Sequence, residues 1–400
     1  MDHAASKAGC DKEKRMAIFS RMEKTQSAGS VPDAMRTAMK QKKTKWLVFL
    51  SLLILAAIAT IYSWDRLGIQ EIPLQILQQK YETPESKYVL INGTSIHYLD
   101  QGKGTVIVAL HGIVDSLHTW DEWATKMIPH YRIVRMDIPG FGLTGPVREG
   151  EYSKEMFTGF LNAFLTELKI DQCILVGNSL GGAIAWNFAL HYPEKVSQLI
   201  LIDPAGYPIE IPWPLSLTET PGIRHVARFI TPRWIFQMSL KQVFGDPSKV
   251  TDSIIDQFYE LNLRPGNRDA LIEIMDSLKK LNQDPTFSKS IANIHTPTLL
   301  LWGKKDTWIP VSHVSRWKQD VPTIHTILYE NTGHVPQLEI PDQVAQDMHQ
   351  WISGNQEKIR DPGKGIWFAV TAGILIILSL LLWMIRKKRL YDFHKPRQVN

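Results

Sequence analysis

A short segment in the middle of the chain, Gly-Asn-Ser-Leu-Gly at 177–181, has the residue types and the spacing of an activated serine. An apolar run typical of a buried strand precedes it (173–176), and an apolar stretch typical of a helix follows it (183–190). A sharp turn between a strand and a helix lifts a serine hydroxyl clear of the sheet, and glycines beside it leave room for neighbouring backbone. Ser179 is therefore the candidate nucleophile, and the chain is predicted to be a hydrolase.

A serine nucleophile needs a histidine to take its proton and a carboxylate to orient that histidine. Two patterns further along the chain supply them in the order Ser, acid, His: Trp-Gly-x-x-Asp, which ends at Asp306, and Gly-His, which ends at His334. We expect His334 to act as the base and Asp306 to fix its tautomer. Asp203, which ends the preceding strand, is a rival for the acid, but we place it in a hydrogen bond near the hinge of a cap.

The negative charge of an acyl-transfer transition state needs two backbone N–H groups aimed at one point. We expect Leu180, the residue after the nucleophile, to supply one of them. We expect Ile113, in the loop after the strand 106–110, to supply the other. His111 is interpreted as a structural histidine of that loop. This chemistry requires no cofactor and no metal, and we expect none.

The elements that must position these residues follow a regular rhythm from residue 88 onward. Continuous apolar strands separated by helical patterns predict a mostly parallel sheet with helices on both faces. The expected strands are 87–91, 94–98, 106–110, 132–136, 172–176, 199–202, 298–302 and 326–329. The expected helices are 117–129, 154–168, 180–191 and 343–352.

One long interval interrupts this rhythm, between the strands at 199–202 and 298–302. It opens with a proline-rich apolar segment and contains three helical patterns, at 232–244, 253–261 and 268–281. A loop this long inside a compact domain should have structure of its own. We therefore predict a core formed by 88–203 and 297–354, a helical cap over 204–296 and a connector at 65–87.

Two stretches near the ends of the chain, 46–64 and 366–385, contain no charged residue and have tryptophans at or near both ends. A helix needs about 20 apolar residues to cross a bilayer, and tryptophan prefers the membrane interface. We expect each stretch to be a transmembrane helix. Two alternatives are buried core helices and, for the first stretch, a signal peptide cleaved near Ala59.

Charge orients these expected spans. Residues 1–45 carry eleven Lys/Arg against five Asp/Glu, and residues 386–400 carry six against one. Because positive flanks stay in the cytoplasm, both basic tails, which we expect to be disordered, should lie there. The basic character of the chain resides in these tails, so no nucleic-acid partner is expected. We expect an integral protein of a bacterial inner membrane with its catalytic domain on the periplasmic side.

The cysteine count agrees with this arrangement. The chain has two cysteines, Cys10 in the first tail and Cys173 in the strand before Ser179. Expected on opposite sides of the membrane, they cannot pair, and no disulfide framework is predicted.

Together these stretches resemble the α/β-hydrolase superfamily, in the branch of lipases and esterases that also contains C–C hydrolases and epoxide hydrolases. The resemblance is carried by the motifs given above and by His-Gly at 111–112, Asp-Ile-Pro-Gly-Phe-Gly at 137–142 and Asp-Pro-Ala-Gly-Tyr-Pro at 203–208. They occur in the family's order over about 88–354. The resemblance implies an α/β-hydrolase fold of eight strands with a triad of Ser179, Asp306 and His334. Membrane spans are unusual in this family.

Three hypotheses of function follow. The first is a serine esterase or lipase that cleaves carboxylic esters, with apolar acyl chains, through an acyl-enzyme; the partners are then an ester or lipid substrate and the bilayer. The second keeps the triad for C–C bond hydrolysis of ring-cleavage products, for acyl transfer or for amide hydrolysis. The third is a non-catalytic binding module, which is disfavoured because every member of the triad is present. A serine nucleophile disfavours epoxide hydrolysis.

Overall fold

Eight strands pair into one sheet in the order β1-β2-β4-β3-β5-β6-β7-β8. The structure is a computed structural model that describes residues 15–22, 33–148 and 151–360. Every run of strand character expected from the sequence forms one of these strands. They are β1 (Ser86–Ile91), β2 (Thr94–Gly102), β3 (Val106–Leu110), β4 (Arg132–Met136), β5 (Cys173–Asn178), β6 (Val196–Ile202), β7 (Thr298–Gly303) and β8 (His325–Tyr329).

The sheet is mostly parallel, as predicted. Strands β3 to β8 pair in parallel, whereas β1–β2 and β2–β4 are antiparallel. A tight turn joins β1 to β2 through Asn92 and Gly93, which have φ values of 49° and 78°. Asn-Gly is the preferred pair for such a turn because both residues tolerate a positive φ. The parallel strands bring their carboxyl ends to one edge of the sheet.

Helices cover both faces of the sheet, because alternate side chains of each buried strand point to opposite sides. Val108 and Leu110 of β3 pack in one apolar cluster with side chains of α5 (Lys154–Glu167) and α6 (Leu180–His191). Ile107 and Ala109 pack in a second cluster with α4 (Asp121–Met127) and α15 (Pro341–Arg360). The remaining core elements are η1 (Leu117–Trp120), η2 (Pro193–Lys195), α13 (His313–Asp320) and α14 (Pro336–Glu339).

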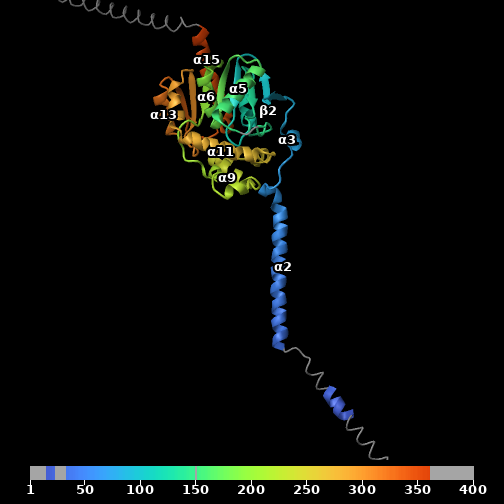
Figure 1. The fold of residues 1–400 in the computed structure, drawn as a ribbon. Coiled ribbons are helices and arrows are strands. Elements are labelled where there is room, and N and C mark those ends of the chain that lie inside the picture. The colour runs from blue at the N-terminus through green and yellow to red at the C-terminus, as the bar shows by residue number, and fades with distance from the viewer. Residues whose placement is uncertain (1–14, 23–32, 149–150, 361–400) are drawn as a thin grey trace, which may run out of the picture. The chain divides into compact units, whose positions relative to one another are not determined.

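The interval between β6 and β7 is helical, as the sequence suggests, and forms a cap. Its helix α10 contacts both α9 and α11, which are labelled in Figure 1. The cap consists of α7 (Trp213–Ser216), α8 (Ile223–Ala227), α9 (Arg233–Val243), η3 (Pro247–Lys249), α10 (Asp252–Asn262), α11 (Asn267–Gln283), α12 (Pro285–Lys289) and η4 (Ser290–Asn293). A short helix in the connector, α3 (Leu74–Tyr81), precedes the sheet.

Two compact units divide the chain, residues 1–65 and residues 66–400. In the described part of the chain, one helix is long and apolar enough, by length and composition alone, to cross a membrane. It is α2 (Asp33–Leu67), and the segment that meets these criteria is Lys40–Thr60. The second expected span, 366–385, and the basic tail at 386–400 lie outside the described residues.

The expectation of a disordered tail over 1–45 is wrong for residues 15–22 and 33–45, which are helical. Ala, Met, Lys and Arg predominate in 33–45, and these residues have high helix propensity. The helix of the apolar stretch therefore extends into the charged segment before it. Helix α13 is not predicted from the sequence either, since only Val314 and Trp317 give it an apolar face.

Candidate active site

Ser179 occupies the sharp turn between β5 and α6. Its φ and ψ are 54° and −115°, a conformation that side chains rarely adopt and that the surrounding backbone must hold in place. The Ser179 N–H donates to the Ile202 carbonyl at 3.0 Å. A Cβ at Gly177 would lie 2.2 Å from the Gly181 carbonyl oxygen, and one at Gly181 would lie 2.4 Å from the His111 carbonyl oxygen. The turn therefore requires both glycines of the motif.

His334 and Asp306 form a buried pair at the same edge of the sheet. Asp306 follows β7, His334 follows β8, and the His334 Nδ1–H donates to Asp306 Oδ2 at 2.7 Å. The other carboxylate oxygen of Asp306 accepts the N–H groups of Trp308 at 2.7 Å and Ile309 at 3.0 Å. Because Nδ1 is bonded to Asp306, Nε2 is the ring nitrogen of His334 that remains for a substrate or a nucleophile.

Asn178, the residue before the candidate nucleophile, connects the serine turn to the histidine loop. Its side-chain amide donates to the carbonyl oxygens of His334 at 3.0 Å and Ile202 at 3.1 Å. The His334 N–H donates in turn to the carbonyl of Val243, the last residue of α9 in the cap. The backbone of the histidine is thus held from the sheet on one side and from the cap on the other.

Ile113 and Leu180, the two expected oxyanion donors, line a cavity together with Ser179 and His334. The loop of Ile113 comes close to the serine: a Cβ at Gly112 would lie 3.4 Å from the Ser179 Cβ. Leu180 begins α6, so its N–H is among those that the helix leaves without an internal partner. The structure therefore brings all five predicted site residues to one place.

Behind the Ile113 loop, His111 is held as a neutral ring. Its Nδ1 lies 2.7 Å from the Gly112 carbonyl, and its Nε2 accepts the Ile138 N–H at 2.9 Å. Burial lowers the pKa of His111 to about 4. Both hydrogen bonds support the structural role expected for this histidine, which joins the loop of Ile113 to the loop after β4.

Asp137 is the buried carboxylate of that second loop. It accepts hydrogen bonds from His97 Nδ1 and from the N–H groups of Leu117 and Leu143, each at 2.8 Å. Burial by itself raises a carboxyl pKa, but the bond from His97 and the charges around it bring the pKa of Asp137 down to about 2. Asp137 therefore carries a charge that holds three segments together.

Asp203, the rival acid, lies fully buried beside the His334–Asp306 pair. Its Oδ1 accepts the Gly303 N–H at 3.0 Å. Ligand-type atoms of Asp203, Asp306 and His334 all lie within 4.8 Å of one another, as they would in a metal site. A metal ion would have to compete with the hydrogen bonds that His334 Nδ1 and both Asp306 oxygens already make. The sequence placed Asp203 in a hydrogen bond near the hinge but did not predict its contact with the pair.

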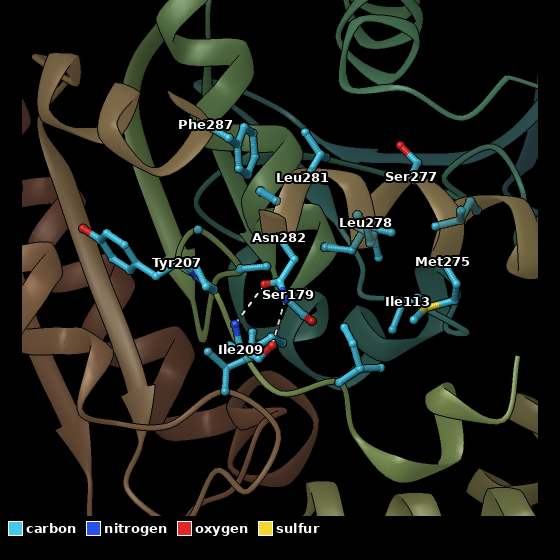
Figure 2. A pocket seen from close by; sticks show the side chains of 18 of the residues that line it. Ile113, Ser179, Tyr207, Ile209, Met275, Ser277, Leu278, Leu281, Asn282 and Phe287 are labelled. Carbon is cyan, nitrogen blue, oxygen red and sulfur yellow. Dashed lines mark hydrogen bonds between the residues drawn. The ribbon is translucent and has the colours of Figure 1, made fainter. Parts of the chain in front are cut away.

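Two apolar cavities meet at Ser179. The first extends between α6 and α11 and is shown in Figure 2. The second extends under α8 and α9. Both are lined by Ile113, Ser179, Leu215, Trp308 and His334. The reactive atoms therefore lie at the junction of two chambers rather than at the end of one.

Most residues that line these chambers were not predicted as site residues. Leu278, Leu281 and Phe287 line the first, and Ile235, Phe236 and Phe258 line the second. The apolar composition of the cap was the only signal in the sequence. That composition does not identify the lining residues, since other large apolar cap residues, Trp213, Trp234 and Met238, are exposed at the surface.

The proline-rich segment 208–212, which precedes α7, forms part of the wall of the first chamber. The Ile209 N–H donates to the Asn282 side-chain oxygen, and the Asn282 amide donates back to the Ile209 carbonyl, both at 2.9 Å (Figure 2). These two hydrogen bonds hold the segment 208–212 against the end of α11.

The sheet order, the serine turn and the cap define the alpha/beta hydrolase fold. A family model described as "alpha/beta hydrolase fold" matches residues 105–234. An epoxide hydrolase and a putative lipase among the solved structures share this fold with the chain.

Among curated proteins, the chain is 27% identical to 2-hydroxy-6-oxo-2,4-heptadienoate hydrolase of Pseudomonas putida, over 63% of this chain and 91% of that protein. It is 29% identical to 2-hydroxy-6-oxo-6-phenylhexa-2,4-dienoate hydrolase of Burkholderia cepacia, over 65% of this chain and 94% of that protein. Both relatives are named for the hydrolysis of dienoates.

Among solved structures, a bacterial membrane phospholipase A superposes with a TM-score of 0.60 at 24% identity, covering 78% of this chain and 98% of that one. A meta-cleavage product hydrolase from Pseudomonas fluorescens superposes with a TM-score of 0.60 at 23% identity, covering 67% and 98%. These likenesses concern the fold.

Proposed function

We propose that this hydrolase is a serine esterase of the lipase type, which cleaves carboxylic esters with apolar chains through an acyl-enzyme. The observation that carries the proposal is the meeting of two apolar chambers at Ser179. An ester has two arms on either side of its carbonyl carbon. A nucleophile at the junction of two apolar chambers suits a substrate in which both arms are apolar.

The geometry supports a defined sequence of proton transfers. Ser179 Oγ attacks the ester carbonyl carbon while His334 Nε2 takes its proton, and Asp306 stabilises the imidazolium through Nδ1–H. The oxyanion accepts hydrogen bonds from the N–H groups of Ile113 and Leu180. His334 then gives the proton to the departing alcohol, and a water activated by His334 releases the acid from Ser179.

The charges at the chambers support an ester over an anionic substrate. In the described part of the chain, the cations that line the chambers are Lys154 and Arg268. Arg268 donates to the Gly68 carbonyl at 2.7 Å and lies 3.6 Å from Glu71. Lys154 lies 3.7 Å from Glu155 and 5.8 Å from the centre of the Phe287 ring. A substrate carboxylate would have to compete with these partners.

C–C bond hydrolysis is the second candidate, and the curated relatives favour it more than they favour ester hydrolysis. Their names specify 2-hydroxy-6-oxo-dienoates, which are ring-cleavage products. The same triad can serve that reaction. Acyl transfer with this triad remains a further alternative, in which an alcohol rather than water would accept the acyl group.

We also propose that α2 tethers the enzyme to a bacterial inner membrane, with the catalytic domain on the periplasmic side. The length and composition of Lys40–Thr60 support the tether, and the basic residues before it support the orientation. The cap supports a lipid substrate, because Ile223, Val226 and Ile230 line the second chamber and are also 43%, 50% and 36% exposed. The second span at 366–385 stays a prediction.

A substrate panel tests the choice between the two reactions. The full chain, purified in detergent micelles, would be given p-nitrophenyl esters of increasing acyl length and, in parallel, 2-hydroxy-6-oxo-dienoates. We expect turnover of the esters, with a preference for the longer chains, and little loss of dienoate absorbance. Faster cleavage of the dienoates would replace the proposal with C–C hydrolysis, and Ser179→Ala is the control for both.

A further inference from the structure

The buried carboxyl of Asp203 has one unexplained oxygen beside the catalytic pair. Asp203 Oδ1 accepts the Gly303 N–H, but Oδ2 is buried and has no hydrogen-bond partner in the described part of the chain. A buried polar atom without a partner is costly. Either Oδ2 carries a proton that it donates, or the fold tolerates an unpaired carboxylate oxygen at its active site.

The backbone fixes Asp203 in this position. It directly follows β6, which pairs in parallel with β7, and its N–H donates to the Leu301 carbonyl at 3.0 Å. Its φ is 43°, a left-handed conformation that is uncommon outside glycine, although aspartate adopts it more readily than most residues. Because β6 and β7 are neighbours, their carboxyl ends place Asp203 and Asp306 side by side.

Asp306 has room for one more donor. Its two oxygens accept three hydrogen bonds, from Trp308, Ile309 and His334. A carboxylate offers about four acceptor positions. Carboxyl oxygens of Asp203 and Asp306 lie within 4.8 Å of each other. Two ionised carboxylates this close would repel each other, whereas one neutral and one ionised carboxyl attract each other through a hydrogen bond.

We infer that Asp203 is a neutral carboxylic acid whose Oδ2–H donates to Asp306 and so positions the acid of the catalytic pair. This inference rests on the proposed function for the role of Asp306. Asp203 does not touch substrate in this account. It acts through Asp306, by holding the carboxylate in line with His334 Nδ1 and by making it a weaker base.

The groups around Asp203 favour its neutral form. Burial and then the charge of Asp306 raise the pKa of Asp203 well above its ordinary value, and Glu339 acts in the same direction. Glu339 accepts N–H groups from Gly245, Asp246 and Gly333. The group that would favour an ionised Asp203 is the His334 ring when it is protonated, since its ligand-type nitrogen lies within 4.8 Å of the carboxyl oxygens of Asp203 and Asp306. A carboxylic acid kept neutral so that it can donate has precedent in enzyme sites.

Two substitutions separate the donor from the charge. Asp203→Asn keeps a donor toward Asp306 and an acceptor for Gly303, whereas Asp203→Leu keeps the size and removes both. We expect kcat for a p-nitrophenyl ester to fall about 10- to 100-fold in Asp203→Leu with KM within about threefold, and Asp203→Asn to recover most of the loss. The acidic limb of the pH profile should stay where it is in Asp203→Asn. A collapse of activity in Asp203→Asn, or a shift of that limb to lower pH, would show that Asp203 is ionised and would overturn the inference.

A folding measurement tests the proton without using activity. If Asp203 is neutral in the fold and ionised when unfolded, folding takes up one proton above about pH 4. The folding equilibrium constant of Asp203→Asn, divided by that of the wild type, should then rise about tenfold per pH unit. The rise should end at the raised pKa of Asp203. Denaturant unfolding of both full chains in detergent micelles measures this ratio, and a ratio independent of pH would overturn the inference.

Infrared spectroscopy identifies the proton directly. The difference spectrum of the wild type minus Asp203→Asn at neutral pH should show the C=O stretch of a protonated carboxylic acid. A carboxylate band in its place would contradict the inference. Because neither this spectrum nor the folding ratio requires a substrate, a wrong assignment of the reaction would leave both results intact.

Discussion

The carboxyl edge of the sheet and the cap surround Ser179 with different kinds of side chain and have different roles. At the edge, polar groups near Ser179 are held by hydrogen bonds whose partners are strand ends and backbone, as for Asn178 and Asp306. The cap surrounds the same atoms with apolar side chains. The edge can therefore hold the reacting groups in fixed positions, whereas the cap selects substrates by volume and shape. Changes at the edge should alter rate, and changes in the cap should alter substrate preference.

The largest effect is expected at the nucleophile. Ser179→Ala removes the only atom that forms the covalent intermediate, so kcat for an ester should fall by about 10⁶-fold. The two chambers stay intact, and the affinity for an unreactive apolar ketone analogue should change little. Steady-state turnover and calorimetric binding of the analogue check this pair of results. Normal turnover in Ser179→Ala would show that the edge of the sheet does not perform the reaction.

The next largest effect is expected at the acid. Asp306→Asn replaces an acceptor of the His334 Nδ1–H with a side chain that favours the other tautomer, and kcat should fall by about 10⁴-fold. Asp171→Asn, at an exposed turn before β5, is the matched control and should leave kcat unchanged. A drop of less than about tenfold in Asp306→Asn would transfer the role of the acid to Asp203.

Substitutions in the cap should change preference rather than rate. Leu278→Trp fills part of the first chamber, and Ile235→Trp fills part of the second. Each should lower kcat/KM for esters with a long chain on its own side by about 10- to 100-fold, with much smaller effects on short esters. Esters lengthened on the acyl side or on the alcohol side would reveal which chamber holds which arm. Equal effects of both variants on every ester would contradict the two-chamber account.

The smallest effect concerns stability, through His111 behind the Ile113 loop. Burial lowers its folded pKa to about 4 from 6.5, so the unfolded chain binds the proton first as the pH falls. The stability that the neutral ring contributes is complete above pH 6.5 and is lost as the pH falls toward 4. The stability deficit of His111→Gln relative to wild type should therefore shrink over this range, by on the order of 3 kcal/mol. Denaturant unfolding measures it, and His295→Gln, at an exposed position, is the control.

The sequence predicted the edge of the sheet better than the cap, for a physical reason. The central strands are short apolar runs, and the serine turn is a local motif whose glycines cannot carry a side chain. Asp306 and His334 follow their strands directly, so strand order alone brings them near Ser179. The approach of Asp203 to Asp306 depends on which strands are neighbours, and the chambers depend on how helices far apart in sequence pack. Neither is encoded in a short pattern.

Two helical segments that the sequence did not predict show the same limit of short sequence patterns. The charged segment 33–45 is helical because it continues an apolar helix, although its own composition resembles a solvated tail. Helix α13 forms because Val314 and Trp317 find a core to pack against, although only two of its residues are strongly apolar. Packing against the core decided α13, whereas the adjoining apolar helix decided 33–45. Neither influence is visible in a short window of sequence.

Mass spectrometry of the trapped intermediate tests the central claim most directly. The full chain would be mixed with a long-chain p-nitrophenyl ester, quenched in acid within the first turnovers and digested. We expect the peptide that contains Ser179 to carry the acyl group as an ester, and the adduct to be absent from Ser179→Ala. An adduct on another residue, or ester turnover with no covalent intermediate and undiminished rate in Ser179→Ala, would contradict the account.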